Sequence, residues 1–75
     1  MEELNCTHLA CPMPILEISK RMKSLKIDDQ LLVKATDAGF KLDLEAWAKA
    51  SGNHIVSFKQ EGNILIALIQ KKQEK

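Results

Sequence analysis

The stretch Cys11-Pro12-Met13-Pro14 places two prolines two positions apart, directly before a run with helical spacing. Apolar residues then recur at spacings of three, four and three, as Ile15, Ile18, Met22 and Leu25. This spacing puts them on one stripe of an α-helix. Because proline is favoured at the first helical position, we predict that Pro12 begins the helix and that Cys11 is its N-cap. Asp28-Asp29 marks the end of the segment.

Strand and helix patterns alternate on either side of this helix. We expect a short strand at Leu4 to Cys6 before it and a second strand at Leu31 to Ala35 after it. Thr36-Asp37 then offers an N-cap for a second helix, whose apolar residues repeat with helical spacing from Phe40 to Ser51. Gly52-Asn53 is a C-terminal stop, because glycine tolerates the left-handed conformation there.

The last third of the chain has the pattern of a β-hairpin. Two strands, Ile55 to Lys59 and Ile64 to Gln70, flank the turn Gln60-Glu61-Gly62-Asn63. The second of these strands is apolar at successive positions instead of alternating, so we expect it to be central in a sheet. The tail from Lys71 to Lys75 is polar, and we expect it to fray.

The order strand, helix, strand, helix, strand, strand predicts an α/β two-layer sandwich with a mixed four-stranded sheet. Two right-handed strand–helix–strand crossovers imply parallel neighbouring strands and place both helices on one face. The last strand returns antiparallel through its short turn. Leu32 faces away from the helices, so the open face keeps apolar surface, which predicts weak self-association or a docking surface.

Length and charge limit the classes of protein to consider. Seventy-five residues form one small domain, residues 1–75. Eleven basic and ten acidic residues leave a formal charge of +1, which argues against nucleic-acid binding through bulk charge. The longest apolar run is too short to span a bilayer, and the start Met1-Glu2-Glu3 is acidic where a secretory signal is basic. We expect a cytoplasmic protein that does not enter a membrane.

Cys11 is the strongest candidate for a chemically reactive residue. At a helix N-terminus, a thiolate meets free N–H groups and the positive end of the helix dipole, which predicts a lowered thiol pKa. The same position would stabilise the anionic outer sulfur of a persulfide. The alternative is that Cys11 is a small buried hydrophobic residue at a strand–helix junction.

The motif Cys11-Pro12-Met13-Pro14 resembles the CPxP motif of the TusA/SirA-type sulfur-carrier family, whose members have this length and element order. The segments Thr36 to Phe40, Ala46-Trp47 and Ser51 to Asn53 also resemble the second-helix region of some members.

The resemblance implies a βαβαββ sandwich in which Cys11 is the catalytic residue. Cys11 would accept sulfur as a persulfide from a donor such as a cysteine desulfurase and pass it to an acceptor protein. Such relays serve tRNA thiolation, sulfur metabolism or cofactor assembly. Pro12 and Pro14 would shape the start of the helix, no metal or cofactor would be needed, and the protein would act between enzymes rather than as a stand-alone enzyme.

One stretch departs from the family pattern. The family commonly has Asp-x-Arg-Gly-Leu before the cysteine, whereas this chain has Asn5-Cys6-Thr7-His8-Leu9. Thr7 in place of arginine removes an anion or partner contact beside the thiol. His8 in place of glycine changes the conformations open to the loop. These changes bear on the donor and the acceptor rather than on the fold.

Two other functions stay open at this point. In the first, Cys6 is a resolving thiol for Cys11 in a thiol-redox protein, which requires Cα atoms within about 7 Å; we favour Cys6 as a core residue of the first strand. In the second, the chain is a non-catalytic regulatory binding module. Cys6, His8, Cys11 and His54 could be counted as zinc ligands, but their spacing fits no common zinc site.

Overall fold

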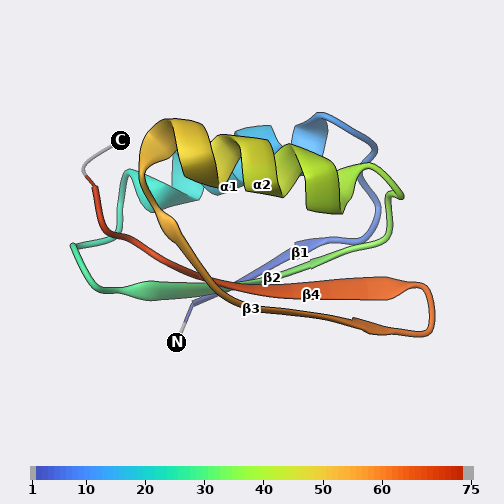
Figure 1. The fold of residues 1–75 in the computed structure, drawn as a ribbon. Helices are drawn as coiled ribbons and strands as arrows, with labels where there is room; N and C mark the ends of the chain where they lie inside the picture. The colour runs from blue at the N-terminus through green and yellow to red at the C-terminus, as the bar shows by residue number, and fades with distance from the viewer. Residues whose placement is uncertain (1, 74–75) are drawn as a thin grey trace.

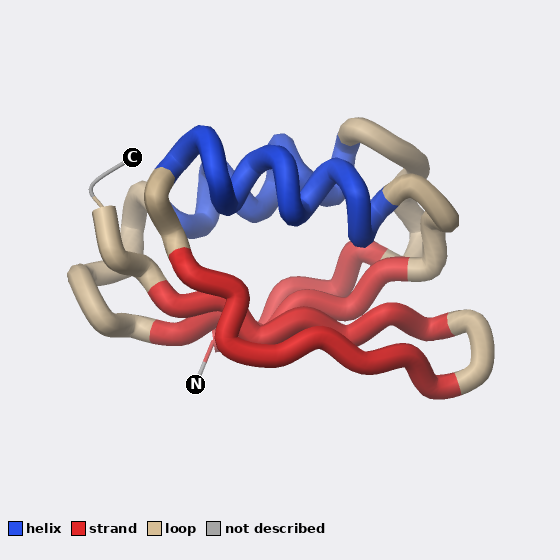
Figure 2. The backbone as a smooth tube through the Cα atoms, in the orientation of Figure 1, coloured by secondary structure: helices blue, strands red, loops and turns tan. Residues whose placement is uncertain are grey.

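The computed structural model describes residues 2–73 and shows the predicted α/β two-layer sandwich. The elements follow in the order β1 (Glu2–Cys6), α1 (Met13–Met22), β2 (Gln30–Ala35), α2 (Phe40–Ser51), β3 (His54–Glu61) and β4 (Ile64–Gln70). Both helices lie on the same face of the four-stranded sheet (Figures 1 and 2). Neither helix is long and apolar enough to cross a membrane, within the residues that the structure describes.

The sheet order is β1-β2-β4-β3, so the prediction of a central β4 is confirmed. β1 and β2 are parallel, and β4 runs antiparallel to both of its neighbours. The prediction that both crossovers join neighbouring strands is wrong for the second one, because β4 lies between β2 and β3. A strand that is apolar on both faces buries most surface at the centre, and the short hairpin lets β4 fold back into that place.

The predicted apolar stripe faces the core, but the helix ends at Met22, so Leu25 of that stripe lies beyond it. α1 buries Pro14, Ile18 and Met22, and α2 buries Phe40 and Leu44. The sheet contributes the remaining buried apolar side chains, which are Cys6, Leu31, Val33, Ala35, Leu65, Ala67 and Ile69. The core therefore lies between the single helical layer and one face of the sheet.

The ends of α2 differ in how well the sequence predicted them. Gly52 has a φ of 78° and donates its N–H to the carbonyl of Ala48 at 2.9 Å, which confirms the C-terminal stop. The predicted N-cap at Thr36-Asp37 is wrong, because Gly39 occupies the N-cap position without a side-chain hydrogen bond. The Asp37 carboxylate instead accepts the N–H of Gly39 at 2.9 Å and so shapes the loop that precedes the helix.

Lys71 corrects the prediction of a fraying tail. Its side chain is 1% exposed, and its Nζ donates to the carbonyls of Met22 at 2.7 Å and Leu25 at 2.6 Å. These carbonyls lie at and just beyond the end of α1, where carbonyl groups lack N–H donors from a next helical turn, and the negative end of the helix dipole favours a cation there. Lys71 thus ties the end of β4 to the end of α1.

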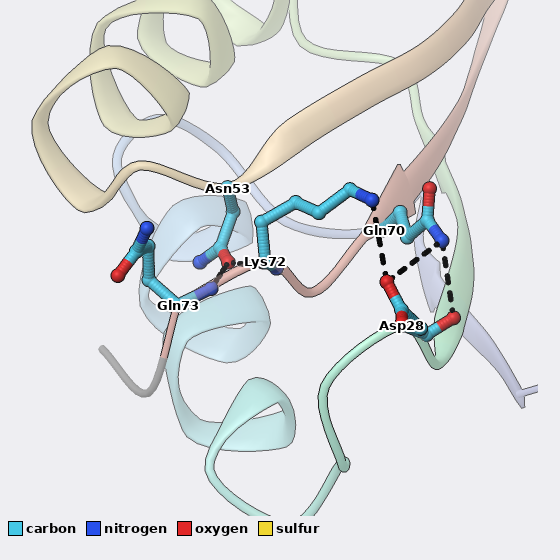
Figure 3. A network of polar contacts seen from close by, with 5 residues as sticks. All are labelled: Asp28, Asn53, Gln70, Lys72 and Gln73. Atoms are coloured by element: carbon cyan, nitrogen blue, oxygen red, sulfur yellow. Dashed lines mark hydrogen bonds and ion pairs between the residues drawn. The ribbon is translucent and has the colours of Figure 1, made fainter.

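The two residues after Lys71 are also held, as Figure 3 shows. The backbone N–H groups of Lys72 and Gln73 donate to Asn53 Oδ1 at 2.8 and 3.0 Å. Lys72 Nζ lies 3.2 Å from Asp28 Oδ1. The tail is therefore ordered through Gln73, and the last two residues of the predicted tail lie outside the described residues.

Replacing Lys71 with methionine is expected to lower the free energy of unfolding by about 2 kcal/mol. Methionine keeps most of the buried volume but leaves two carbonyls without the charged donor. Hydrogen bonds to charged groups contribute roughly 1.5–3 kcal/mol each, and the loss is partly offset because the variant no longer buries an ammonium group. Urea unfolding of Lys71→Met measures the change. Lys72→Met is the matched control, because Lys72 is exposed and surface ion pairs contribute about 0–1 kcal/mol. Equal losses in both variants would contradict the assigned role of Lys71.

The sheet face away from the helices carries the apolar surface that the sequence predicted. Leu32 lies opposite Leu68, and Ile66 lies between Lys34 and Lys59 of the neighbouring strands. The three apolar side chains are half-buried. Self-association through this face stays a prediction, which sedimentation at high concentration would test.

Candidate functional site

Cys11 lies in the loop between β1 and α1, at the end of the molecule where both helices begin (Figure 1). Its side chain is exposed, and the Cys11–Pro12 peptide bond is cis. The predicted start of the helix is wrong by one residue: α1 begins at Met13, with Pro12 as its N-cap. The carbonyl of Pro12 accepts the N–H of Leu16 at 3.3 Å, the first bond of the helix, so Cys11 lies just outside it. Pro14 occupies an early helical position and is buried.

The residues that depart from the family pattern hold the loop before Cys11. Asn5 Oδ1 accepts hydrogen bonds from the backbone N–H and the hydroxyl of Thr7, at 3.0 and 2.7 Å. The Thr7 carbonyl in turn accepts the hydroxyl of Thr36 at 2.7 Å, which joins this loop to the loop before α2. His8 is exposed. Asn5 and Thr7 thus form a local polar turn.

The Cys11 thiol donates a hydrogen bond to the carboxylate of Asp43, on the first turn of α2. Gly39 lies beside this pair. A Cβ atom added at Gly39 would lie 3.1 Å from Asp37 Oδ2, 3.8 Å from Cys11 Cβ and 3.9 Å from Asp43 Oδ2. Two carboxylates and the thiol therefore converge on the start of α2, and an alanine at position 39 would press on the Asp37 carboxylate.

The predicted lowering of the Cys11 pKa is wrong. The hydrogen bond to Asp43 raises the pKa of the thiol, as do partial desolvation and the negative charges of Asp43 and Asp37. A carboxylate that accepts the S–H proton stabilises the neutral thiol, and a nearby like charge disfavours the thiolate.

The start of α1 provides no free N–H donors that would offset the effect of these carboxylates on the thiol. The N–H of Met13 donates to the carbonyl of Ala10 at 2.8 Å, and the N–H of Ile15 donates to the carbonyl of Pro12 at 3.1 Å. Pro14 has no N–H. The first three helical residues therefore offer no free N–H to an anion, contrary to the expectation from the sequence.

Cys6 is fully buried and belongs to the hydrophobic core, as the sequence predicted. Burial raises the pKa of its thiol, and the charge of Glu17 adds to the rise. Both cysteines are free. The four residues that could be counted as zinc ligands are not brought together, since no group of three or more His, Cys, Asp or Glu side chains between residues 2 and 73 could hold a metal ion.

Comparison with known proteins identifies the family of the chain. The family described as Sulfurtransferase TusA matches residues 2–71 of the chain. The chain belongs to the TusA family. The family resemblance inferred from Cys11-Pro12-Met13-Pro14 and from the element order is thereby confirmed, and the chain is a member of a sulfur-carrier family.

Three relatives illustrate the range of the TusA family. YrkI of Bacillus subtilis strain 168 is 46% identical over 68 residues, which cover 91% of this chain and 91% of that protein. The sulfur carrier protein TusA of Allochromatium vinosum is 39% identical over 70 residues, 93% of this chain and 92% of that protein. YrkF of Bacillus subtilis is 46% identical over 71 residues, 95% of this chain but only 38% of the longer relative.

Sequence reasoning found Cys11 in this TusA-family chain and missed Asp43. The topology contains a signal that could have found it: two successive strand–helix–strand crossovers start both helices at the same edge of the sheet. A polar side chain in the first turn of the second helix is then a candidate neighbour of the loop before the first. Asp43 meets that description, being the acidic residue in the first turn of α2.

Proposed function

We propose that this chain is a sulfur carrier in which Cys11 accepts a sulfur atom as a persulfide and passes it to an acceptor protein. The observation that supports this most directly is the contrast between the two thiols. Cys11 is exposed in the Cys-Pro-x-Pro motif, whereas Cys6 is buried in the core. Pro12 and Pro14 shape the start of α1, Pro12 as its N-cap and Pro14 as a buried anchor.

The transfer is an exchange between sulfur atoms at a single exposed thiol. The Cys11 thiolate attacks the outer sulfur of a donor persulfide, a new S–S bond forms at Cys11 Sγ, and the S–S bond of the donor breaks. The donor cysteine leaves as a thiolate and takes up the proton that Cys11 gave up. Atoms and electrons balance without an oxidant, a reductant, a metal or a cofactor. The reverse exchange, with an acceptor thiol, unloads the carrier.

The exchange of sulfur between thiols indicates which classes of protein donate sulfur to the carrier and accept it. The donor is a protein that carries a persulfide, such as a cysteine desulfurase, and the acceptor is a protein of tRNA thiolation, sulfur metabolism or cofactor assembly. The carrier works between these enzymes in the cytoplasm, where thiols stay reduced. It reaches RNA products only through the acceptor, in keeping with its formal charge of +1.

Incubation of the wild-type chain with a cysteine desulfurase and cysteine is expected to add the mass of one sulfur atom. Peptide mass analysis should locate that sulfur on the peptide that contains Cys11, and a reductant should remove it. Omitting cysteine is the control. Sulfur found on Cys6, or the absence of loading from this and other persulfide donors, would contradict the carrier function and favour the binding module.

A further inference from the structure

The acidic pair, Asp37 and Asp43, surrounds Cys11 with negative charge. Asp43 accepts a hydrogen bond from the thiol, and a Cβ atom added at Gly39 would lie 3.1 Å from Asp37 Oδ2 and 3.9 Å from Asp43 Oδ2. No ion pair within residues 2–73 involves either carboxylate. The negative charges of both carboxylates raise the pKa of the thiol. The acidic pair is therefore open to a cation from outside the chain.

We propose that Asp43 holds Cys11 as a neutral thiol in the free carrier, and that a partner releases it with a lysine or arginine beside its own reactive cysteine. The inference rests on the proposed function and adds the chemistry by which the carrier selects partners. Cys11, the thiol donor, and Asp43, the acceptor, are 32 positions apart in the sequence and meet in an exposed site. A cation that docks between them would pair with the carboxylate and leave the sulfur free to ionise.

The exchange of sulfur follows directly from this arrangement. When the partner's cation pairs with Asp43, the Cys11 proton dissociates, and the thiolate attacks the outer sulfur of the partner's persulfide. The bond between that outer sulfur and the partner's cysteine breaks, and the leaving thiolate takes up one proton. The product at Cys11 is a persulfide, which is more acidic than a thiol and carries negative charge next to Asp43. Repulsion between this negative charge and the Asp43 carboxylate favours transfer of the outer sulfur to the next cationic partner.

Two matched variants test the effect of Asp43 on the thiol itself. Asp43→Asn keeps an oxygen that can accept the S–H bond but removes the charge. It should speed alkylation of Cys11 by iodoacetamide at pH 7 about tenfold, because the carboxylate charge that disfavours the reactive thiolate is gone. Glu45→Gln removes the same charge from an exposed position of α2 and should change the rate little. Circular dichroism confirms that each variant is folded, and equal rates in all three proteins would overturn the proposal.

The selection of partners is tested with two short peptides that carry a cysteine persulfide. One peptide has arginine on both sides of the cysteine, and the other has glutamate. With the wild-type carrier, the arginine peptide should load Cys11 about tenfold faster or more, because opposite charges raise and like charges lower the rate of productive encounter. Asp43→Asn should remove most of this preference, and Glu45→Gln should keep it.

The outcomes separate this inference from the proposed function. Equal loading by both peptides in the wild-type chain would overturn cation selection and leave the carrier function standing. A preference that persists unchanged in Asp43→Asn would also overturn it, because the charge responsible would lie elsewhere. Loading by neither peptide, together with no loading by the desulfurase, would contradict the carrier function itself.

Discussion

Replacing Cys11 with serine is expected to abolish sulfur loading, reducing the added mass to background. A serine hydroxyl cannot form the S–S bond that stores the sulfur, and Cys6, the other sulfur nucleophile in the chain, is fully buried. The carrier should nevertheless fold normally, because Cys11 is exposed and surface substitutions usually change stability by about 0.5 kcal/mol or less. Intact-mass analysis after incubation with the desulfurase and cysteine measures the loss.

Cys6→Ala is the matched control for this experiment. It removes the second thiol and should keep loading at the wild-type level, with a stability loss of about 1 kcal/mol for the buried sulfur. Loss of loading in Cys6→Ala, with circular dichroism unchanged, would contradict a single-thiol carrier. An intramolecular disulfide between Cys6 and Cys11 in the oxidised wild-type chain would likewise favour the thiol-redox alternative.

Replacing Phe40 with alanine is expected to lower the free energy of unfolding by about 3–5 kcal/mol, the usual cost of deleting a buried phenylalanine ring. Phe40 is 1% exposed at the start of α2, and its ring stacks on Phe58 with centroids 6.1 Å apart. A domain of this size has a small core, so the loss is a large part of its stability. Thermal unfolding should show a fall in Tm of more than about 12 °C, at 4 °C or more per kcal/mol.

Leu42→Ala is the matched control on the same helix. Leu42 is 73% exposed, so the same kind of truncation removes little buried surface and should change stability by about 0.5 kcal/mol or less. A Tm for Phe40→Ala close to that of Leu42→Ala would contradict the assignment of Phe40 to the core. The contrast also bears on the site, because Phe40 anchors the turn of α2 that presents Asp43.

The element order and the apolar faces could be predicted from the sequence because they depend on neighbours within a few residues. The stripe from Ile15 to Leu25 repeats with the period of a helix, and the turn at Gly62 follows from local backbone preferences. The central position of β4 was also predictable, since a strand without polar alternation needs cover on both faces. Cys11 was found for the same reason: the two prolines around Met13 mark the start of a helix wherever the chain folds.

The state of Cys11 and the role of Lys71 were decided only by the tertiary structure. Asp43 meets Cys11 across 32 positions, and Lys71 reaches Met22 across 49, so no local pattern contains either contact. Ionisation depends on distance in space: a carboxylate at hydrogen-bond distance outweighs a helix end whose N–H groups are already bonded. Burial of Lys71 likewise lets its ammonium group cap the end of α1. The sequence by itself therefore determined which loop carries the exposed thiol of Cys11, and the packing of α2 against that loop decided that the pKa of the thiol is raised rather than lowered.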